Sequence, residues 1–162
     1  MAIGMPQTSC DPNWHGLLPP QRFLSRRRFV RVALDAPDFK PGSWRGAGKV
    51  VFDSESGVFW LTTRPRMAGV RGYAVEIYSS RNGEAFRLVK SMPKEEVSRL
   101  CGVKVNSIEG QQILKDPSTG RYHLYLALDD GAGWGTFLFS FEDPVGPWRF
   151  ECEAIRRAEA YD

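Results

Sequence analysis

The fold is decided by the stretch Gly48-Lys-Val-Val-Phe-Asp-Ser-Glu-Ser-Gly57-Val-Phe-Trp-Leu61, because a second stretch of the same design follows about 60 residues later. The second copy reads Gly110-Gln-Gln-Ile-Leu-Lys-Asp-Pro-Ser-Thr-Gly120-Arg-Tyr-His-Leu124. Each copy places a run of strand-forming residues on either side of a polar turn that ends in glycine. Two further glycine pairs recur at the same spacing, Gly72 with Gly135 and Gly83 with Gly146. The sequence therefore predicts an internal repeat.

Each copy of the repeat contains four short runs rich in β-branched and aromatic residues, which predict strands. In the first copy they are Lys49–Asp53, Val58–Thr63, Tyr73–Ser79 and Phe86–Lys90. In the second copy they are Gln111–Lys115, Tyr122–Leu128, Thr136–Phe141 and Trp148–Glu153. Between the copies, Pro93–Leu100 has a proline near its start and acidic residues in its first turn, which predicts one short helix.

Four strands in each repeat of this length are typical of the blades of a β-propeller. A single twisted sheet cannot cover both of its faces, whereas blades that pack face to face around an axis leave only short edges exposed. A β-sandwich would have strands of similar length but would give no reason for the repeat. We expect an all-β protein that consists of two consecutive four-stranded antiparallel propeller blades.

The domain organisation follows from this pattern. Residues 1–43 are expected to form an irregular arm rich in proline, with a lead-in strand at Phe29–Leu34 and a loop at Asp35–Ser43. The first blade is assigned to residues 44–92, the helical connector to 93–106 and the second blade to 107–154. Residues 155–162 are expected to be a polar tail, helical or frayed.

Composition excludes several classes of function. The net charge of +3, without aromatic residues placed among the basic ones, does not indicate nucleic-acid binding. Three cysteines and two histidines, all far apart, do not predict a metal site, a redox site or a cofactor. No apolar run is long enough to span a membrane, and no secretory signal is visible at the start of the sequence. The expected compartment is the cytoplasm.

The second repeat carries motifs that resemble a known family. Ser107-Ile-Glu-Gly-Gln111, followed by Ile113-Leu-Lys-Asp-Pro-Ser-Thr-Gly-Arg-Tyr-His-Leu-Tyr125, resembles the E-G-P…G-x-Y-Y-L segment of five-bladed propeller glycosidases, glycoside hydrolase families 43 and 32. Phe139-Ser-Phe-Glu-Asp-Pro-Val-Gly-Pro-Trp148 resembles the S-x-D-x-x-G-P-W turn at the outer edge of their blades. The resemblance covers residues 44 to 153.

The resemblance implies catalytic residues. The glutamate of the E-G motif is the general acid in that family, and it corresponds here to Glu109. Glycoside hydrolysis also needs a second carboxylate, for which Asp38 is the candidate that precedes the first blade. The sequence departs from the family in two respects: Ala47 stands at the position of the first blade that matches Glu109, and the family's third carboxylate has no counterpart.

Blade topology adds candidates for substrate binding. The approach to each innermost strand and the loop after each second strand share one face of a propeller, and a mixture of aromatic, guanidinium and carboxylate groups there suits a sugar. The residues placed on this face besides Glu109 are Trp44, Arg45, Arg64, Arg66, Ser107, Asp129 and Asp130.

Two functions remain open at this point. One is a glycosidase-like segment that acts on a carbohydrate with Glu109 as the acid. The other is a non-catalytic module that binds a carbohydrate or assembles with itself. Two blades cannot close a ring, so we expect either a homo-oligomer or association with the missing remainder of a propeller.

Overall fold

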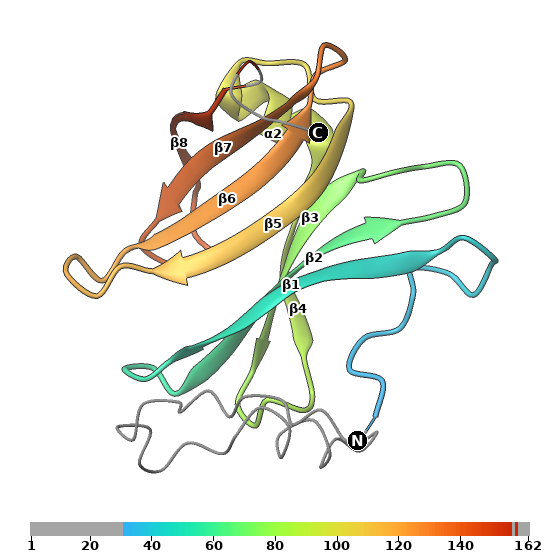
Figure 1. Ribbon diagram of the computed structural model, residues 1–162. Coiled ribbons are helices and arrows are strands. Elements are labelled where there is room, and N and C mark those ends of the chain that lie inside the picture. Colours follow the sequence, from blue (N-terminus) through green and yellow to red (C-terminus); the bar gives the residue numbers. More distant parts are fainter. Residues whose placement is uncertain (1–30, 157, 159–162) are drawn as a thin grey trace, which may run out of the picture. The chain divides into compact units, whose positions relative to one another are not determined.

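The computed structural model describes residues 31–156 and residue 158. Two sheets form within this part of the chain, and in each of them four antiparallel strands follow one another in sequence order. Both sheets belong to one unit that begins at Val32. Figure 1 shows the first sheet in cyan to green and the second in yellow to red. The predicted fold class is confirmed for the described residues. Most of the predicted arm, residues 1–30, lies outside them.

The strands coincide with the predicted runs, but several extend further. The first sheet contains β1 (Trp44–Asp53), β2 (Val58–Arg66), β3 (Ala74–Ser80) and β4 (Arg87–Pro93). The second contains β5 (Ser107–Lys115), β6 (Tyr122–Asp129), β7 (Trp134–Phe141) and β8 (Arg149–Ile155). The largest extensions are at the starts of β1 and β5, where polar residues and glycine interrupt the alternating pattern that predicts a strand. Pairing with a neighbouring strand, such as that of Trp44 with Arg66, extends the ladder there.

Two local predictions were wrong. The lead-in strand at Phe29–Leu34 does not form in its described part, because residues 31–34 are coil and bend. An alternating pattern makes a strand only where a neighbour completes its hydrogen bonds, and within the described part of the chain no strand pairs with residues 31–34. At the other end, β8 continues through Ile155 because Ile155 pairs with Thr136 of β7, so residue 155 belongs to the sheet and not to the tail.

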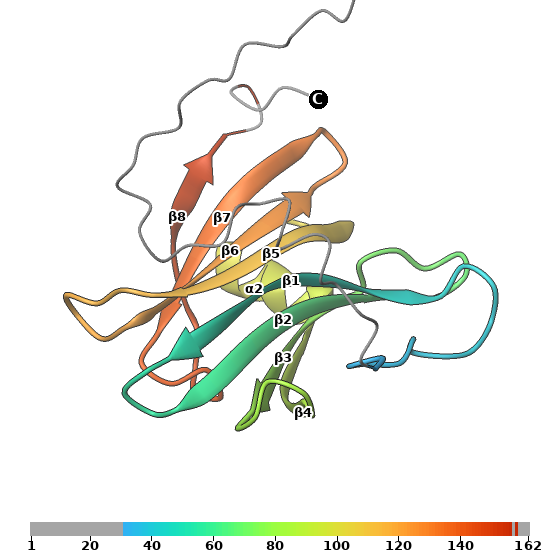
Figure 2. The same ribbon diagram turned by 60° about the horizontal axis from the view of Figure 1, so that its bottom comes forward.

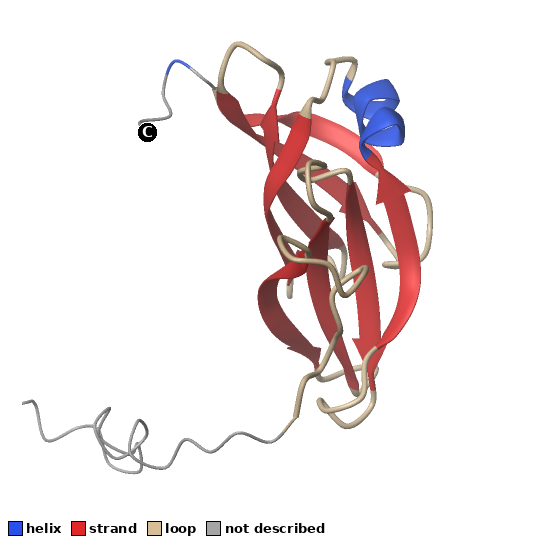
Figure 3. Ribbon diagram, turned by 90° about the vertical axis from the view of Figure 1, so that its right-hand side faces the viewer, coloured by secondary structure: helices blue, strands red, loops and turns tan. Residues whose placement is uncertain are grey.

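The predicted helix is α2 (Lys94–Cys101), which connects the two sheets. Glu95 and Glu96 lie in its first turn, where they complement the helix dipole. The helix ends at Gly102, whose left-handed backbone (φ 70°) directs its N–H to the carbonyl of Ser98. Val97 is fully buried in the core. Figure 3 shows the helix beside the ends of the strands.

The core lies between the two sheets. Strand β6 alternates between buried and half-buried residues, which directs Leu124 and Leu126 to the interior. Val75 and Ile77 of β3 face them from the first sheet and are fully buried. Figure 2 shows the two sheets from a second direction, with β1 and β5 adjacent. Each sheet therefore covers one face of the other, as blades do.

Strands β1 and β5 approach each other closely beside the β-bulge that each of them carries. The pairing register shifts between Ala47 and Val50 in β1, and between Ile108 and Gln111 in β5. The side chain of Gln111 donates to the carbonyl oxygen of Gly46 at 2.8 Å. A Cβ atom at Gly48 would lie 2.6 Å from the carbonyl oxygen of Gln111. Gly48 is thus required by the close contact between the innermost strands.

Asp53, at the end of β1, joins the sheets at the opposite end of these strands. Its carboxylate is only 3% exposed and accepts hydrogen bonds from the Tyr122 hydroxyl at 2.6 Å and from Lys115 Nζ at 2.9 Å. It also accepts from the Ser56 hydroxyl at 2.6 Å within its own turn. One buried carboxylate therefore connects the first sheet to β5 and β6.

The described residues contain no helix that is both long and apolar enough to cross a bilayer.

Candidate functional site

The candidate site lies at the end of the sheets where β1 and β5 begin. Three connections meet there, namely the β2–β3 loop, the segment between α2 and β5, and the β6–β7 loop. They enclose a pocket of about 310 Å³. Its lining consists of two cations, two neutral polar side chains, one carboxylate, one indole and two loop residues: Arg71, Lys94, Asn106, Ser107, Asp129, Trp134, Gly69 and Val70.

Glu109 lies in the bulge of β5, next to this pocket. A bulge changes the direction of a side chain relative to the regular strand. The Glu109 carboxylate forms ion pairs with Arg64 of β2 and with Arg71 of the β2–β3 loop, whose Nη2 lies 3.0 Å from Oε1. The Glu109 and Arg64 side chains are about four-fifths buried, whereas that of Arg71 is 58% exposed. Two predicted residues, Glu109 and Arg64, are thus brought into direct contact.

Ser107, the first residue of β5, pairs with Asp129, the last residue of β6. The Ser107 hydroxyl lies 3.4 Å from Oε1 of Glu109. The Asp129 carboxylate accepts from the Gly131 N–H at 2.8 Å, and its carbonyl accepts from the Asn106 N–H at 2.7 Å. These bonds fix the turn that presents Trp134, the residue paired with Asp129 in β7.

The β2–β3 loop is attached to β5 through Gly72. The Ile108 N–H donates to the Gly72 carbonyl at 3.0 Å. Gly72 has a φ of 42°, and a Cβ atom there would lie 2.0 Å from the carbonyl oxygen of Ile108. Only glycine allows this contact, which holds Arg71 next to Glu109.

Trp44 and Arg66, both predicted, are paired at the start of β1 and the end of β2. The Arg66 guanidinium carbon lies 4.4 Å from the centre of the Trp44 indole, and the Trp44 side chain is partly exposed. This cation–π contact forms an aromatic and cationic surface at the same end of the first sheet.

Two other predicted residues, Arg45 and Asp130, make different contacts. The Arg45 guanidinium donates at 2.7 Å to buried Glu76, which points to the face of the first sheet opposite Val75 and Ile77. Asp130 accepts from the N–H of Ala132 at 3.0 Å within the β6–β7 loop.

Asp38 accepts from the Ser43 hydroxyl and from the Lys40 N–H. These bonds, the one from Ser43 above all, lower the pKa of Asp38. The pKa of the nearby Tyr73 is raised mainly by burial and then by Glu76; Arg45 opposes this, and the charge of Asp38 adds the smallest raising effect. No hydrogen bond or ion pair joins Asp38 to Glu109.

Four residues of the site were missed at the level of sequence, namely Arg71, Lys94, Asn106 and Trp134. Lys94 is the first residue of α2, and its ammonium group donates to the Asn106 carbonyl at 3.0 Å. The same topological rule that selected Asp129 would have selected Arg71 and Trp134 if the loops had been followed to their ends. Asn106 directly precedes Ser107 in the approach to β5, so the rule that selected Ser107 would have included it as well. Lys94 gave no signal, because its contact with Asn106 depends on the path of the connector.

The site offers hydrogen-bond donors, carboxylates and an indole. No group of three or more His, Cys, Asp or Glu side chains within the described residues is arranged to hold a metal ion. Charged side chains on rigid strands beside an aromatic ring can bind a hydroxyl-rich ligand. A carboxylate in such a position can also act in proton transfer.

The sequence matches no protein-family model and no curated protein. The fold is similar to that of a family 117 glycoside hydrolase produced by the marine bacterium Zobellia galactanivorans, with a TM-score of 0.52 and 14% identity, over 74% of this chain and 42% of that chain. A proposed exo-β-1,3-galactanase from Bifidobacterium bifidum s17 gives a TM-score of 0.45 and 16% identity, over 70% of this chain and 36% of that chain. The chain spans less than half the length of either structure.

Proposed function

We propose that this chain is a two-blade segment of a glycosidase-like propeller and that it binds a carbohydrate at the end of the sheets where β1 and β5 begin. The observation that carries the proposal is the pocket in which Trp134 lies among Arg71, Asn106 and Asp129. Guanidinium, amide and carboxylate groups bind sugar hydroxyls, and an indole packs on the C–H surface of a sugar ring. The fold, which is similar to that of a family 117 glycoside hydrolase, supports a carbohydrate over other polar ligands.

Binding is the function that the contacts of Glu109 support best. The guanidinium groups of Arg64 and Arg71 form ion pairs with both oxygens of its carboxylate. A general acid must instead direct a carboxyl oxygen at the departing glycosidic oxygen of the substrate. In our proposal, Glu109 holds the two arginines in place, and Arg71, the more exposed of them, contacts the ligand.

Removal of the Arg71 side chain is expected to weaken binding without unfolding the protein, because this side chain is largely exposed. Loss of one charge-assisted hydrogen bond should raise the dissociation constant about tenfold. Isothermal titration calorimetry of Arg71→Ala against gluco-, galacto-, xylo- and arabino-oligosaccharides measures this. Arg99→Ala, an exposed arginine on α2, is the matched control. Equal affinities of Arg71→Ala and the wild type would exclude Arg71 from the site.

Hydrolysis is the second candidate function, and the position of Glu109 in the β5 bulge favours it. Ser107 contacts Glu109 through its hydroxyl and pairs with Asp129 across the strands, and Asp129 is therefore our candidate for the second carboxylate. In this reaction Glu109 would donate a proton to the departing glycosidic oxygen, and the second carboxylate would activate water or attack the sugar. Asp38 makes no contact with this group and is left out of the proposal.

Glu109→Gln separates the two functions. If the chain hydrolyses a glycoside, this variant should lose turnover at least about 100-fold, because it removes the transferable proton and keeps the shape of the side chain. Release of reducing sugar from the bound oligosaccharides is the measurement, with the exposed Glu84→Gln as control. Turnover that is unchanged in Glu109→Gln would remove Glu109 from the catalytic role.

Further blades are part of the same proposal. Val50 and Phe52 of β1 are about half exposed, and so is Leu114 of β5. Exposed apolar side chains on a strand favour packing against another blade. We propose that such blades come from a second copy or from the remainder of a larger propeller.

A further inference from the structure

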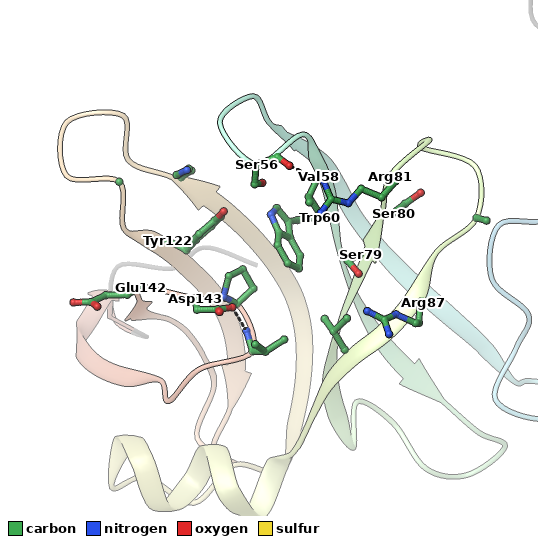
Figure 4. A pocket seen from close by; sticks show the side chains of 16 residues that line it. Ser56, Val58, Trp60, Ser79, Ser80, Arg81, Arg87, Tyr122, Glu142 and Asp143 are labelled. Carbon is green, nitrogen blue, oxygen red and sulfur yellow. Dashed lines mark hydrogen bonds between the residues drawn. The ribbon is translucent and has the colours of Figure 1, made fainter.

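A second and larger pocket lies at the opposite end of the sheets. It has a volume of about 640 Å³ and is lined by residues of all four β-turns that connect paired strands there, such as Ser56, Arg81, Gly120 and Asp143. Figure 4 shows Trp60 in the middle of this pocket, with Tyr122 on one side and Arg81 and Arg87 on the other. The volume is in the range of sites that bind small organic ligands.

The pocket has an aromatic wall. Trp60 of β2 and Tyr122 of β6 meet edge to face, with ring centres 6.1 Å apart. The Trp60 indole is half-buried, and its N–H lies near the Tyr122 hydroxyl without making a hydrogen bond of normal geometry. The pocket therefore presents an indole surface beside the Tyr122 ring, while the indole N–H itself is buried.

Some polar groups around this indole are already engaged. The Tyr122 hydroxyl donates to Asp53, and Lys115 pairs with Asp53 and Glu55. Burial, followed by the effect of Asp53, raises the pKa of Tyr122 to about 12, so its hydroxyl stays protonated at neutral pH. Arg81 donates to the Ser56 carbonyl at 2.8 Å.

Other groups in the pocket remain available for a ligand. Among residues 31–156, no hydrogen-bond or ion-pair partner is found for the Ser79 hydroxyl, the Arg87 guanidinium or the Glu142 carboxylate. Ser79 is half-buried, while Arg87 and Glu142 are exposed on opposite walls. Both signs of charge therefore border the indole, which favours a neutral ligand with many hydroxyl groups over an anion.

We propose that this pocket is a second carbohydrate site, which takes a neutral disaccharide with one ring against Trp60. Arg87, Ser79 and Glu142 bind its hydroxyl groups from the two walls. The site is separate from the one beside Glu109, since its residues come from the turns at the other end of the strands. A chain with both sites would hold a polysaccharide at two points.

The test is a nuclear magnetic resonance titration of the wild type with maltose, lactose, cellobiose and xylobiose, followed at the indole N–H signals. Trp60→Phe assigns the Trp60 signal and keeps an aromatic ring in the core. We expect a saturable shift of this signal with one of the four sugars. Arg87→Ala should weaken that binding about tenfold and leave folding unchanged, because Arg87 is exposed and unpaired.

Two controls keep the second site distinct from the first. Arg71→Ala should leave the Trp60 shift unchanged, and Arg99→Ala should have no effect. Absence of any Trp60 shift would overturn the proposal, and so would a Trp60 shift that Arg71→Ala abolishes. An equal affinity of Arg87→Ala and the wild type would overturn the assigned contacts. Absence of a Trp60 shift would leave the proposal for the site beside Glu109 untouched.

Discussion

Replacement of Gly72 by alanine is expected to destabilise the chain by about 3 kcal/mol or more, since overpacking of this size acts together with a positive φ. The added Cβ atom would lie 2.0 Å from the carbonyl oxygen and 2.5 Å from the nitrogen of Ile108. Both are backbone atoms, which cannot rotate away, so the β2–β3 loop would have to leave β5. We expect weaker oligosaccharide binding as well, because Arg71 and Ser107 adjoin this contact.

Gly69→Ala is the matched control for this experiment. Gly69 lies in the same loop and also has a positive φ, 78°, but a Cβ atom added there would meet no other atom within 4 Å. It should cost only about 1 kcal/mol, the penalty of the backbone conformation alone. Urea unfolding followed by circular dichroism gives both values. Equal costs for the two variants would show that Gly72 does not hold the loop against β5.

Asp53→Ala is expected to lower the free energy of unfolding by about 4 kcal/mol, because losing one partner of a buried ion pair has a cost of this size. The Asp53 carboxylate is buried and accepts from Ser56, Tyr122 and Lys115. Its removal would leave the Lys115 ammonium group with only the exposed Glu55. Because these bonds connect the two sheets, the loss should appear as one cooperative transition at lower urea concentration.

The effect of Asp53 should depend on pH in a defined direction. Burial alone would raise the pKa of Asp53, but hydrogen bonds from Ser56, Tyr122 and Lys115 outweigh it and hold the pKa well below its usual range. A folded-state pKa below the unfolded value of about 3.9 stabilises the fold above that pH. The stability difference between wild type and Asp53→Asn should be constant from about pH 5 to 8 and should shrink as the pH falls below about 4.

Asp116→Asn provides the control, because Asp116 occupies the corresponding turn of the second sheet. It accepts from Ser118 and Thr119, which lower its pKa to about 2. It caps its own turn and forms no hydrogen bond or ion pair with the described residues of the first sheet. A cost as large as that of Asp53→Asn would show that turn capping, and not the connection between sheets, determines the effect.

The fold was predictable because short-range sequence patterns encode the strands and turns of each repeat. Alternating apolar residues such as Leu124 and Leu126, and glycines at turns, determine strands and their connections locally. The starts of β1 and β5 were not visible, because Gly46, Gly48 and Gly110 interrupt the pattern where the two strands approach each other. The close approach of β1 to β5 requires glycine at position 48, where an added Cβ atom would lie 2.6 Å from the carbonyl oxygen of Gln111, and no local propensity reveals this.

The candidate site was predictable in part. Topology placed Arg64, Ser107 and Glu109 on one end of the sheets, and the structure brings them together. Topology did not give side-chain direction, so Arg45 was expected at the site although its strand position directs it to Glu76. The glycine contact at Gly72 and the path of the connector to Asn106 depend on tertiary structure alone.

The central claim is that a carbohydrate binds at the end of the sheets where β1 and β5 begin. Backbone amide signals of the wild type, titrated with the four classes of oligosaccharide and observed by nuclear magnetic resonance, test it most directly. We predict saturable shifts with at least one sugar, grouped at Arg71, Asn106, Ser107 and the loop that ends at Trp134. The claim would be contradicted if these amides stayed unchanged with every sugar at millimolar concentration.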